Sequence, residues 1–108
     1  MNTFNLKLKY GTYNNCFFKV NKYRNGNIAL GIYNMSDGPI CTVTVNPGMA
    51  LPDDLIAIKN YSENSGVLES LIELGFIEDV VGTLPQGFVE IPICTYNKEM
   101  IDNYSEHN

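Results

Sequence analysis

The chain has 108 residues, of which 44% are hydrophobic and 18% are charged. This size and composition are typical of one globular domain, and they argue against a disordered chain or a coiled coil. No apolar run approaches the roughly 18 residues that a membrane helix requires, and the first residues lack the basic start and apolar stretch of a signal peptide. We therefore expect a soluble cytoplasmic protein in which residues 1–108 form a single domain and which has no membrane partner.

The net charge of −5 is distributed unevenly along the chain. Residues 1–52 contain five basic residues and one acidic residue, whereas residues 53–108 contain two basic and eleven acidic residues. The first half thus carries a charge of +4 and the second half a charge of −9. If the two halves form different faces, an acidic face is available for a basic protein, and a local basic patch is available for phosphate groups.

The cysteines and the single histidine limit the chemistry that we expect. Cys16, Cys41 and Cys94 are an odd number of cysteines, which argues against a disulfide framework, and each fits a buried strand position. Their spacing does not predict a zinc site, and a Cys–His catalytic pair would require His107, next to the last residue, to be held in place. No P-loop, metalloprotease or hydrolase motif is present. We therefore expect no enzymatic activity, no metal and no cofactor.

Hydrophobic alternation predicts that most of the chain is β-structure. Strands are predicted over residues 4–10, 16–23, 28–33, 40–45, 55–59 and 88–96. The Asn25-Gly26 pair between the second and third of these strands is a strong hairpin signal, because both residues tolerate a positive φ. Pro92 cannot donate a hydrogen bond to a sheet, so we expect the last strand at an edge or with a bulge.

The remaining segments complete the predicted fold. Hydrophobic residues at helical spacing predict a helix over 66–74, and Gly75 fits the position after its end that favours a positive φ. Residues 76–81 fit either a short strand or an irregular link, and residues 82–87 fit a turn. The acidic segment 97–108 is expected to be a frayed tail, or one weak helical turn. The sequence thus predicts an α+β fold, a mostly antiparallel sheet of about five to six strands with one helix packed on one face.

Several of these segments carry a resemblance to a known family. The Asn-Gly hairpin is followed by Ile28-Ala-Leu30, and further marks are Thr44-Val-Asn46, Gly87-Phe88 and Pro92. In these turn and strand signals, roughly residues 20–97 resemble a family of small domains of unknown function from gut bacteria and their plasmids, conjugative elements and phages. The resemblance implies an accessory protein of mobile DNA, and it supplies no catalytic residues.

The features that remain indicate binding rather than catalysis. Small size, acidity and the lack of catalytic motifs fit a non-enzymatic binding protein of a mobile element that occludes a host protein, as an anti-defence or regulatory inhibitor. We expect the host protein to have a basic surface, because acidic residues of the second half would steer it into contact. These residues are Glu63, Glu69, Glu73, Glu78 and Asp79.

Two alternatives stay open. The first is a nucleic-acid or nucleotide binder with a basic and tyrosine-rich patch in the N-terminal half, where tyrosines stack on bases and cations contact phosphates. Its candidate residues are Lys19, Lys22, Tyr23, Arg24 and Tyr33. The second is a homodimer formed by pairing of an exposed sheet edge.

Overall fold

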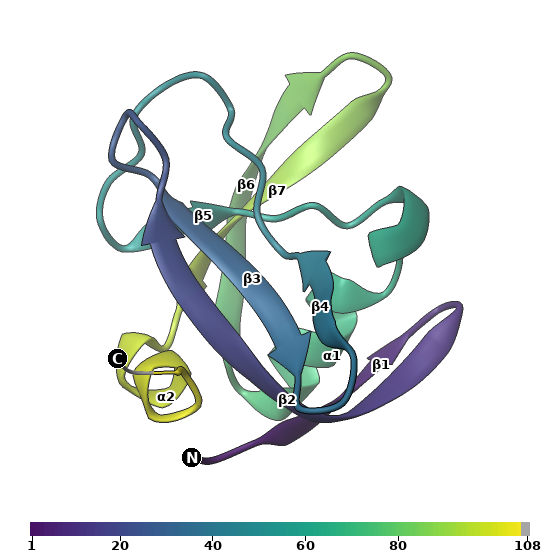
Figure 1. Ribbon diagram of the computed structural model, residues 1–108. Helices are drawn as coiled ribbons and strands as arrows, with labels where there is room; N and C mark the ends of the chain where they lie inside the picture. Colours follow the sequence, from purple (N-terminus) through teal and green to yellow (C-terminus); the bar gives the residue numbers. More distant parts are fainter. Residues whose placement is uncertain (107–108) are drawn as a thin grey trace.

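The computed structural model describes residues 1–106 and confirms an α+β fold that is mostly antiparallel sheet (Figure 1). These residues form seven strands, two α-helices and one 3-10 helix. Both strands and helices are thus more numerous than the sequence predicted. The strands are β1 (Phe4–Leu8), β2 (Gly11–Lys22), β3 (Ile28–Asn34), β4 (Gly38–Thr42), β5 (Leu55–Ala57), β6 (Ile77–Gln86) and β7 (Val89–Tyr96). The helices are η1 (Ser62–Asn64), α1 (Val67–Leu74) and α2 (Lys98–Asn103).

The first sheet has the strand order β1-β2-β3-β4, and all neighbours are antiparallel. β2 begins at Gly11, earlier than predicted, because the chain turns already at Lys9 and Tyr10. The predicted hairpin between β2 and β3 is confirmed. Its turn contains Gly26 with a φ of +90°, a conformation that glycine adopts without steric cost.

The second sheet has the order β5-β7-β6, so β7 is a central strand and the predicted edge position is wrong. The N–H and C=O sites of one residue in an antiparallel strand point to the same side. The carbonyl of Pro92 accepts a 2.9 Å hydrogen bond from the N–H of Ile58, so the side of Pro92 that lacks a donor faces the residue just after β5. The other expectation for the last strand was a bulge. The bulge is instead in the neighbouring strand β6, where Val81 has no partner opposite it in β7.

The hairpin of β6 and β7 is the largest departure from the predicted elements. Residues 77–86 form one ten-residue strand, although the sequence suggested a short strand or link followed by a turn. Pairing with β7 extends from Ile77 opposite Tyr96 to Gln86 opposite Val89. Figure 1 shows the far part of this hairpin projecting beyond the rest of the molecule.

Both sheets contribute to one main hydrophobic core. Phe18 of the first sheet meets Phe76, just before β6, with ring centroids 4.8 Å apart and the rings at 87°. Phe4 contacts both rings, also at centroid distances of 4.8 Å. A second, smaller core on the other face of the second sheet is built on Ala57, Ile91 and Ile93. The sheets are also joined at their edges by a bridge between Thr44 and Ile58.

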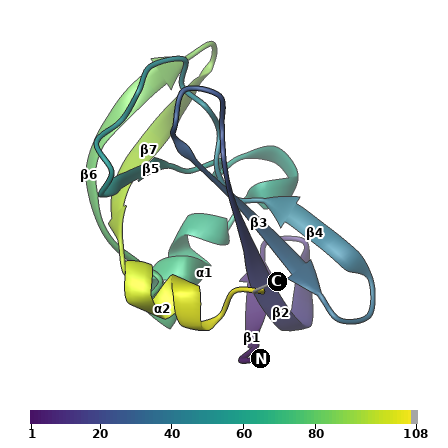
Figure 2. The same ribbon diagram turned by 60° about the vertical axis from the view of Figure 1, so that its left-hand side comes forward.

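Helix α1 is confirmed within one residue of its predicted start, and it packs against β1 and β6. Gly75 ends the helix with a φ of +89°, as the sequence predicted. Figure 2 shows α1 and α2 between the two sheets, at the end of the molecule opposite the tip of the β6–β7 hairpin. Among the described residues, no helix has the length and hydrophobicity needed to cross a bilayer.

The C-terminal segment up to residue 106 is folded, in contrast to the expected frayed tail. Asn97 caps α2 by accepting a hydrogen bond from the N–H of Met100, and Ile101 is buried in the main core. Ser105 then forms a parallel bridge with Phe18 of β2. The N–H of Phe18 donates to the carbonyl of Tyr104, and the carbonyl of Phe18 accepts from the N–H of Glu106. The apolar face of one helical turn and these backbone bonds order the segment. His107, considered above for a catalytic pair, lies outside the described residues.

Candidate functional site

The tip of the β6–β7 hairpin presents a completely exposed aromatic side chain. Gln86 pairs with Val89, so only Gly87 and Phe88 remain in the turn. Gly87 has a φ of +63°, as a type II′ hairpin turn requires of its first central residue. The relative exposure of Phe88 is 110%. An aromatic ring that stays fully in water does not contribute the favourable free energy of burial that such residues normally give to folding. This position is therefore unusual for a residue with only a structural role.

Two further exposed hydrophobic residues lie near the start of β6, an edge strand of its sheet, at the end of the hairpin away from Phe88. Val80 and Val81 have relative exposures of 47% and 56%. They directly follow Glu78 and Asp79, which are also exposed. We call these four residues together with Phe88 the hairpin surface. Apolar side chains grouped with charged residues on one exposed element are typical of a protein-binding surface.

The backbone of β6 is poorly suited to pair with another strand. Glu78 and Asp79 together lie opposite one residue of β7, and Val81 has no partner opposite it, so the strand contains two bulges. The N–H of Asp79 is bonded to the hydroxyl oxygen of Thr95 at 3.1 Å. Pro85, which has no N–H, lies further along. Bulges, carboxylates and proline are features that protect edge strands from pairing, so a partner would bind the side chains of this hairpin.

A neighbouring loop adds to the same end of the molecule. Both views show loop 46–52 and the β2–β3 turn at the end where the β6–β7 hairpin has its tip (Figures 1 and 2). Asn27 fixes this loop: its amide nitrogen donates to the carbonyl of Met49, and its amide oxygen accepts from the N–H of Leu51, both at 2.7 Å. Met49 itself is half exposed. The hairpin surface therefore lies beside a loop that is held rigidly in place.

The predicted acidic residues are all exposed, and they occupy three places. Glu78 and Asp79 belong to the hairpin surface. Glu69 and Glu73 lie one turn apart on α1 and line a shallow pocket together with Lys7 and Lys9 of the neighbouring chain segment. The acidic face is therefore interrupted by two lysines at this point.

Glu63 differs from the other predicted acidic residues by forming a salt bridge within residues 1–106. Its carboxylate accepts a hydrogen bond from the ammonium of Lys59 at 2.5 Å. This bond is the main reason why the pKa of Glu63 is lowered to about 2. Because Lys59 largely neutralises it, Glu63 contributes less to an acidic surface than its sequence position suggested.

The predicted nucleic-acid residues do not form one continuous patch. Lys19 lies over the ring of Tyr33 at 4.2 Å and forms a 3.3 Å salt bridge with Glu106. Tyr23 uses its hydroxyl group to donate to the carbonyl of Thr44 at 3.2 Å, which ties it to the first sheet. Lys22 and Lys19 are three residues apart and therefore point to opposite faces of β2, and Arg24 lies in the turn.

The three cysteine thiols have raised pKa values. Burial raises the pKa of the Cys16 thiol, and it raises the pKa values of Cys41 and Cys94 to about 11. A thiol in this state is a poor nucleophile, because the thiolate is the reactive form. In the part of the chain that the structure describes, no group of three or more histidine, cysteine or acidic residues converges as a metal site would require.

Sequence reasoning identified two of the five residues of the hairpin surface, Glu78 and Asp79. It placed Phe88 at the start of a strand and left Val80 and Val81 in an ambiguous segment. The signal that could have located Phe88 is the Gln86-Gly87-Phe88-Val89 stretch, because a glycine between two strand-forming runs fits a two-residue turn. Exposure of the valines depends on the edge position of β6 and on its bulges, which local sequence does not encode.

Comparison of the chain with protein-family models, with curated proteins and with solved structures finds no match. The resemblance to small domains of mobile elements therefore stays a prediction.

Proposed function

We propose that this chain is a non-enzymatic binding protein that uses its hairpin surface to cover a basic site on another protein. The observation that carries the proposal is the fully exposed Phe88 at the tip of a projecting hairpin. Aromatic residues are frequent among the few side chains that supply most of the binding energy of an interface. Phe88 is thus the expected anchor, inserted in an apolar pocket of the partner.

The charges of the hairpin select the partner. Glu78 and Asp79 lie on the same strand as Val80 and Val81, and none of them forms a salt bridge among residues 1–106. Unpaired carboxylates next to an apolar contact attract a basic surface during encounter and disfavour an acidic one. Seven strand residues, roughly 20 Å, separate Asp79 from Gln86 at the tip. We therefore assign the partner as a protein with an apolar pocket for Phe88 and a separate group of lysine or arginine residues that faces the base of the hairpin.

The proposed action on the partner is occlusion. A small protein without catalytic motifs can inhibit another protein by covering the site that the target uses for its own ligand. The resemblance to accessory domains of mobile DNA supports a host protein as the target, in an anti-defence or regulatory role. A basic site that normally binds nucleic acid is a suitable target, because an acidic protein competes with nucleic acid for it.

The test captures proteins from a host lysate with the tagged chain after nuclease treatment. Three proteins are compared: the wild type, Phe88→Ala, and a double variant with Glu78→Lys and Asp79→Lys. We expect the wild type to retain a basic protein that both variants lose. Tyr10→Ala and Glu99→Lys are matched controls, because they remove an exposed aromatic ring and an exposed carboxylate at other places. Both controls should retain the protein.

Other results would contradict the proposal in different ways. Retention of the same protein by wild type and Phe88→Ala at equal levels would show that the hairpin tip is not the anchor. Recovery that disappears with nuclease would favour the nucleic-acid alternative. A wild-type chain that forms dimers in light scattering, with Phe88→Ala monomeric, would identify a second copy as the partner of the hairpin surface.

A further inference from the structure

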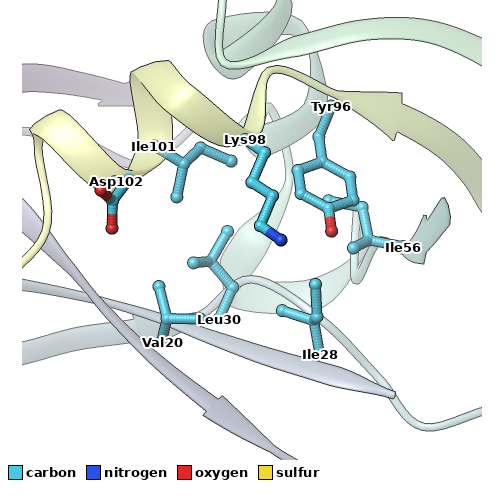
Figure 3. A pocket seen from close by; sticks show the side chains of 8 residues that line it. All are labelled: Val20, Ile28, Leu30, Ile56, Tyr96, Lys98, Ile101 and Asp102. Carbon is cyan, nitrogen blue, oxygen red and sulfur yellow. The ribbon is translucent and has the colours of Figure 1, made fainter. Parts of the chain in front are cut away.

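A recess between the two sheets, next to α2, has the properties of a small ligand site (Figure 3). Its floor consists of the buried side chains of Leu30, Ile56 and Ile101, and Val20 at its rim is 48% exposed. The cavity has a volume of about 110 Å³. An engineered cavity of about 150 Å³ holds benzene, so this recess has space for a short or branched hydrocarbon group.

A second cavity of about 220 Å³ adjoins the first and shares Val20, Ile28, Tyr96 and Lys98 with it. The second cavity is more polar, because Lys22 of β2 and Asp53 also line it. The two cavities thus form one recess with an apolar end and a charged end. The hydroxyl group of Tyr96 donates to the carbonyl of Asp53 at 2.8 Å and fixes the wall between them.

Two lysines from different elements line the charged end. Figure 3 shows the side chain of Lys98 extending from the start of α2 over the space between Tyr96 and Leu30. Lys22 reaches the second cavity from β2. Within residues 1–106, neither lysine forms a salt bridge. Both lysine side chains are exposed, so their ammonium groups are accessible to an anion at the mouth of the recess.

The acidic residues limit the charge of the ligand. Asp53 is the one carboxylate of the second cavity, so two lysines and one aspartate leave a single positive charge there. Asp102 lies at the other end of the first cavity from Tyr96 and is already engaged in an interaction (Figure 3). A single excess positive charge at this end matches the one negative charge of a carboxylate better than the two charges of a phosphate dianion.

We propose that this recess binds a small apolar carboxylate, with the carboxylate group between Lys22 and Lys98 and the hydrocarbon part against Leu30 and Ile56. This site shares no residue with the hairpin surface, so it is independent of the proposed protein partner. The polar end gives orientation and the apolar end gives most of the burial, which is the usual division in small-molecule sites.

The test uses hexanoate as the probe and hexanol as its uncharged counterpart, with binding followed by NMR shifts of the methyl groups of Val20, Ile28 and Ile56. We expect saturable shifts with hexanoate and at least tenfold weaker binding of hexanol. Lys98→Gln should weaken hexanoate binding by about tenfold or more, since a hydrogen bond to a charged group is lost. Lys9→Gln is the control, because this exposed lysine lines neither cavity.

Val20→Phe tests the apolar end separately. The larger ring would fill the first cavity, so hexanoate should no longer bind even though both lysines are present. If this variant does not fold, Lys98→Gln still decides the question. The proposal is overturned if the three methyl groups show no saturable shift up to the solubility limit of hexanoate. Equal binding of hexanol, or unchanged binding by Lys98→Gln, would overturn it as well.

Discussion

Gln86 and Val89 are paired across the end of the β6–β7 hairpin, and this pairing determines the exposure of the residue between them. Val89 packs against the smaller core, whereas Phe88, one residue earlier, is fully exposed. The two-residue turn gives Phe88 no neighbour to pack on. A hairpin that fixes its own register thus holds an aromatic ring in water at a defined place, which is the pre-organisation that a binding anchor needs.

Phe88→Ala should leave the stability of the protein nearly unchanged. The ring buries no surface in the free chain, so the free energy of unfolding should change by no more than about 0.5 kcal/mol, as for other exposed positions. Urea unfolding of the wild type and the variant measures this difference. A loss above about 1.5 kcal/mol would show that Phe88 supports the fold and would remove the argument that the ring is kept for binding.

Phe18→Ala should have the opposite effect. Phe18 is completely buried and contacts Phe4 and Phe76 in the main core. Removal of a buried phenyl ring costs about 3–5 kcal/mol, which is a large part of the total stability of a small domain. The same urea experiment provides the measurement. A cost similar to that of Phe88→Ala would mean that the aromatic cluster does not hold the two sheets together.

Asn27→Ala should release loop 46–52. The side chain of Asn27 accepts a hydrogen bond from the N–H of Leu51 and donates to the carbonyl of Met49. Loss of these part-buried bonds should cost about 1–3 kcal/mol. Hydrogen exchange of the Leu51 amide should become faster. Asn14→Ala is the control, since Asn14 is exposed and lies outside the bonds that hold this loop. Unchanged protection of Leu51 in Asn27→Ala would contradict the proposed role of Asn27.

The Glu63–Lys59 pair should make stability depend on pH in the acidic range. The pKa of Glu63 falls from 4.5 to about 2 in the folded chain, mainly through its hydrogen bond with Lys59. A carboxyl group with a lowered folded pKa stabilises the fold above its ordinary pKa, and this contribution is lost as the pH falls toward the folded value. The difference in unfolding free energy between wild type and Glu63→Gln should therefore shrink between about pH 4.5 and pH 2.

Because the pair is exposed, its contribution should be small and should decrease with added salt. Thermal unfolding of both proteins across this pH range, at low and high salt, provides the measurement. A difference between the two proteins that stays constant with pH would show that Glu63 is not held in its ionised form by Lys59.

The cysteine thiols should react slowly with alkylating reagents in the folded protein. The pKa values of Cys41 and Cys94 are raised to about 11 by burial, so little thiolate is present near pH 8. Mass spectrometry after exposure to iodoacetamide should show little modification of either residue, and rapid modification in denaturant. Fast labelling of Cys94 in the folded state would indicate that β7 opens readily.

Much of the fold could be predicted because local signals and tertiary structure agree in those segments. Alternating residues give β1, the Asn25-Gly26 turn gives the β2–β3 hairpin, and Gly75 marks the end of α1. In each case the residues that determine the element are adjacent in sequence, and the element buries the face that the pattern predicts.

The prediction failed where distant contacts decide the structure. Pro92 suggested that its strand lies at a sheet edge. A central strand can contain proline where the adjacent strand ends, and β5 ends opposite Ile93, next to Pro92. The C-terminal segment has a weak helical pattern, and its order depends on the bonds from Ser105 and its neighbours to Phe18. The exposed valines of β6 follow from its bulges and from its edge position, which appear only when the pairing with β7 is known.

The central claim is that Phe88 anchors this chain to a basic protein. The most direct test is the dissociation constant of the purified partner, once captured, for the wild type, Phe88→Ala and the control Tyr10→Ala. We predict that Phe88→Ala raises the dissociation constant at least about thirtyfold, as the loss of an interface anchor does, and that Tyr10→Ala leaves it unchanged. Equal dissociation constants for all three proteins would contradict the claim.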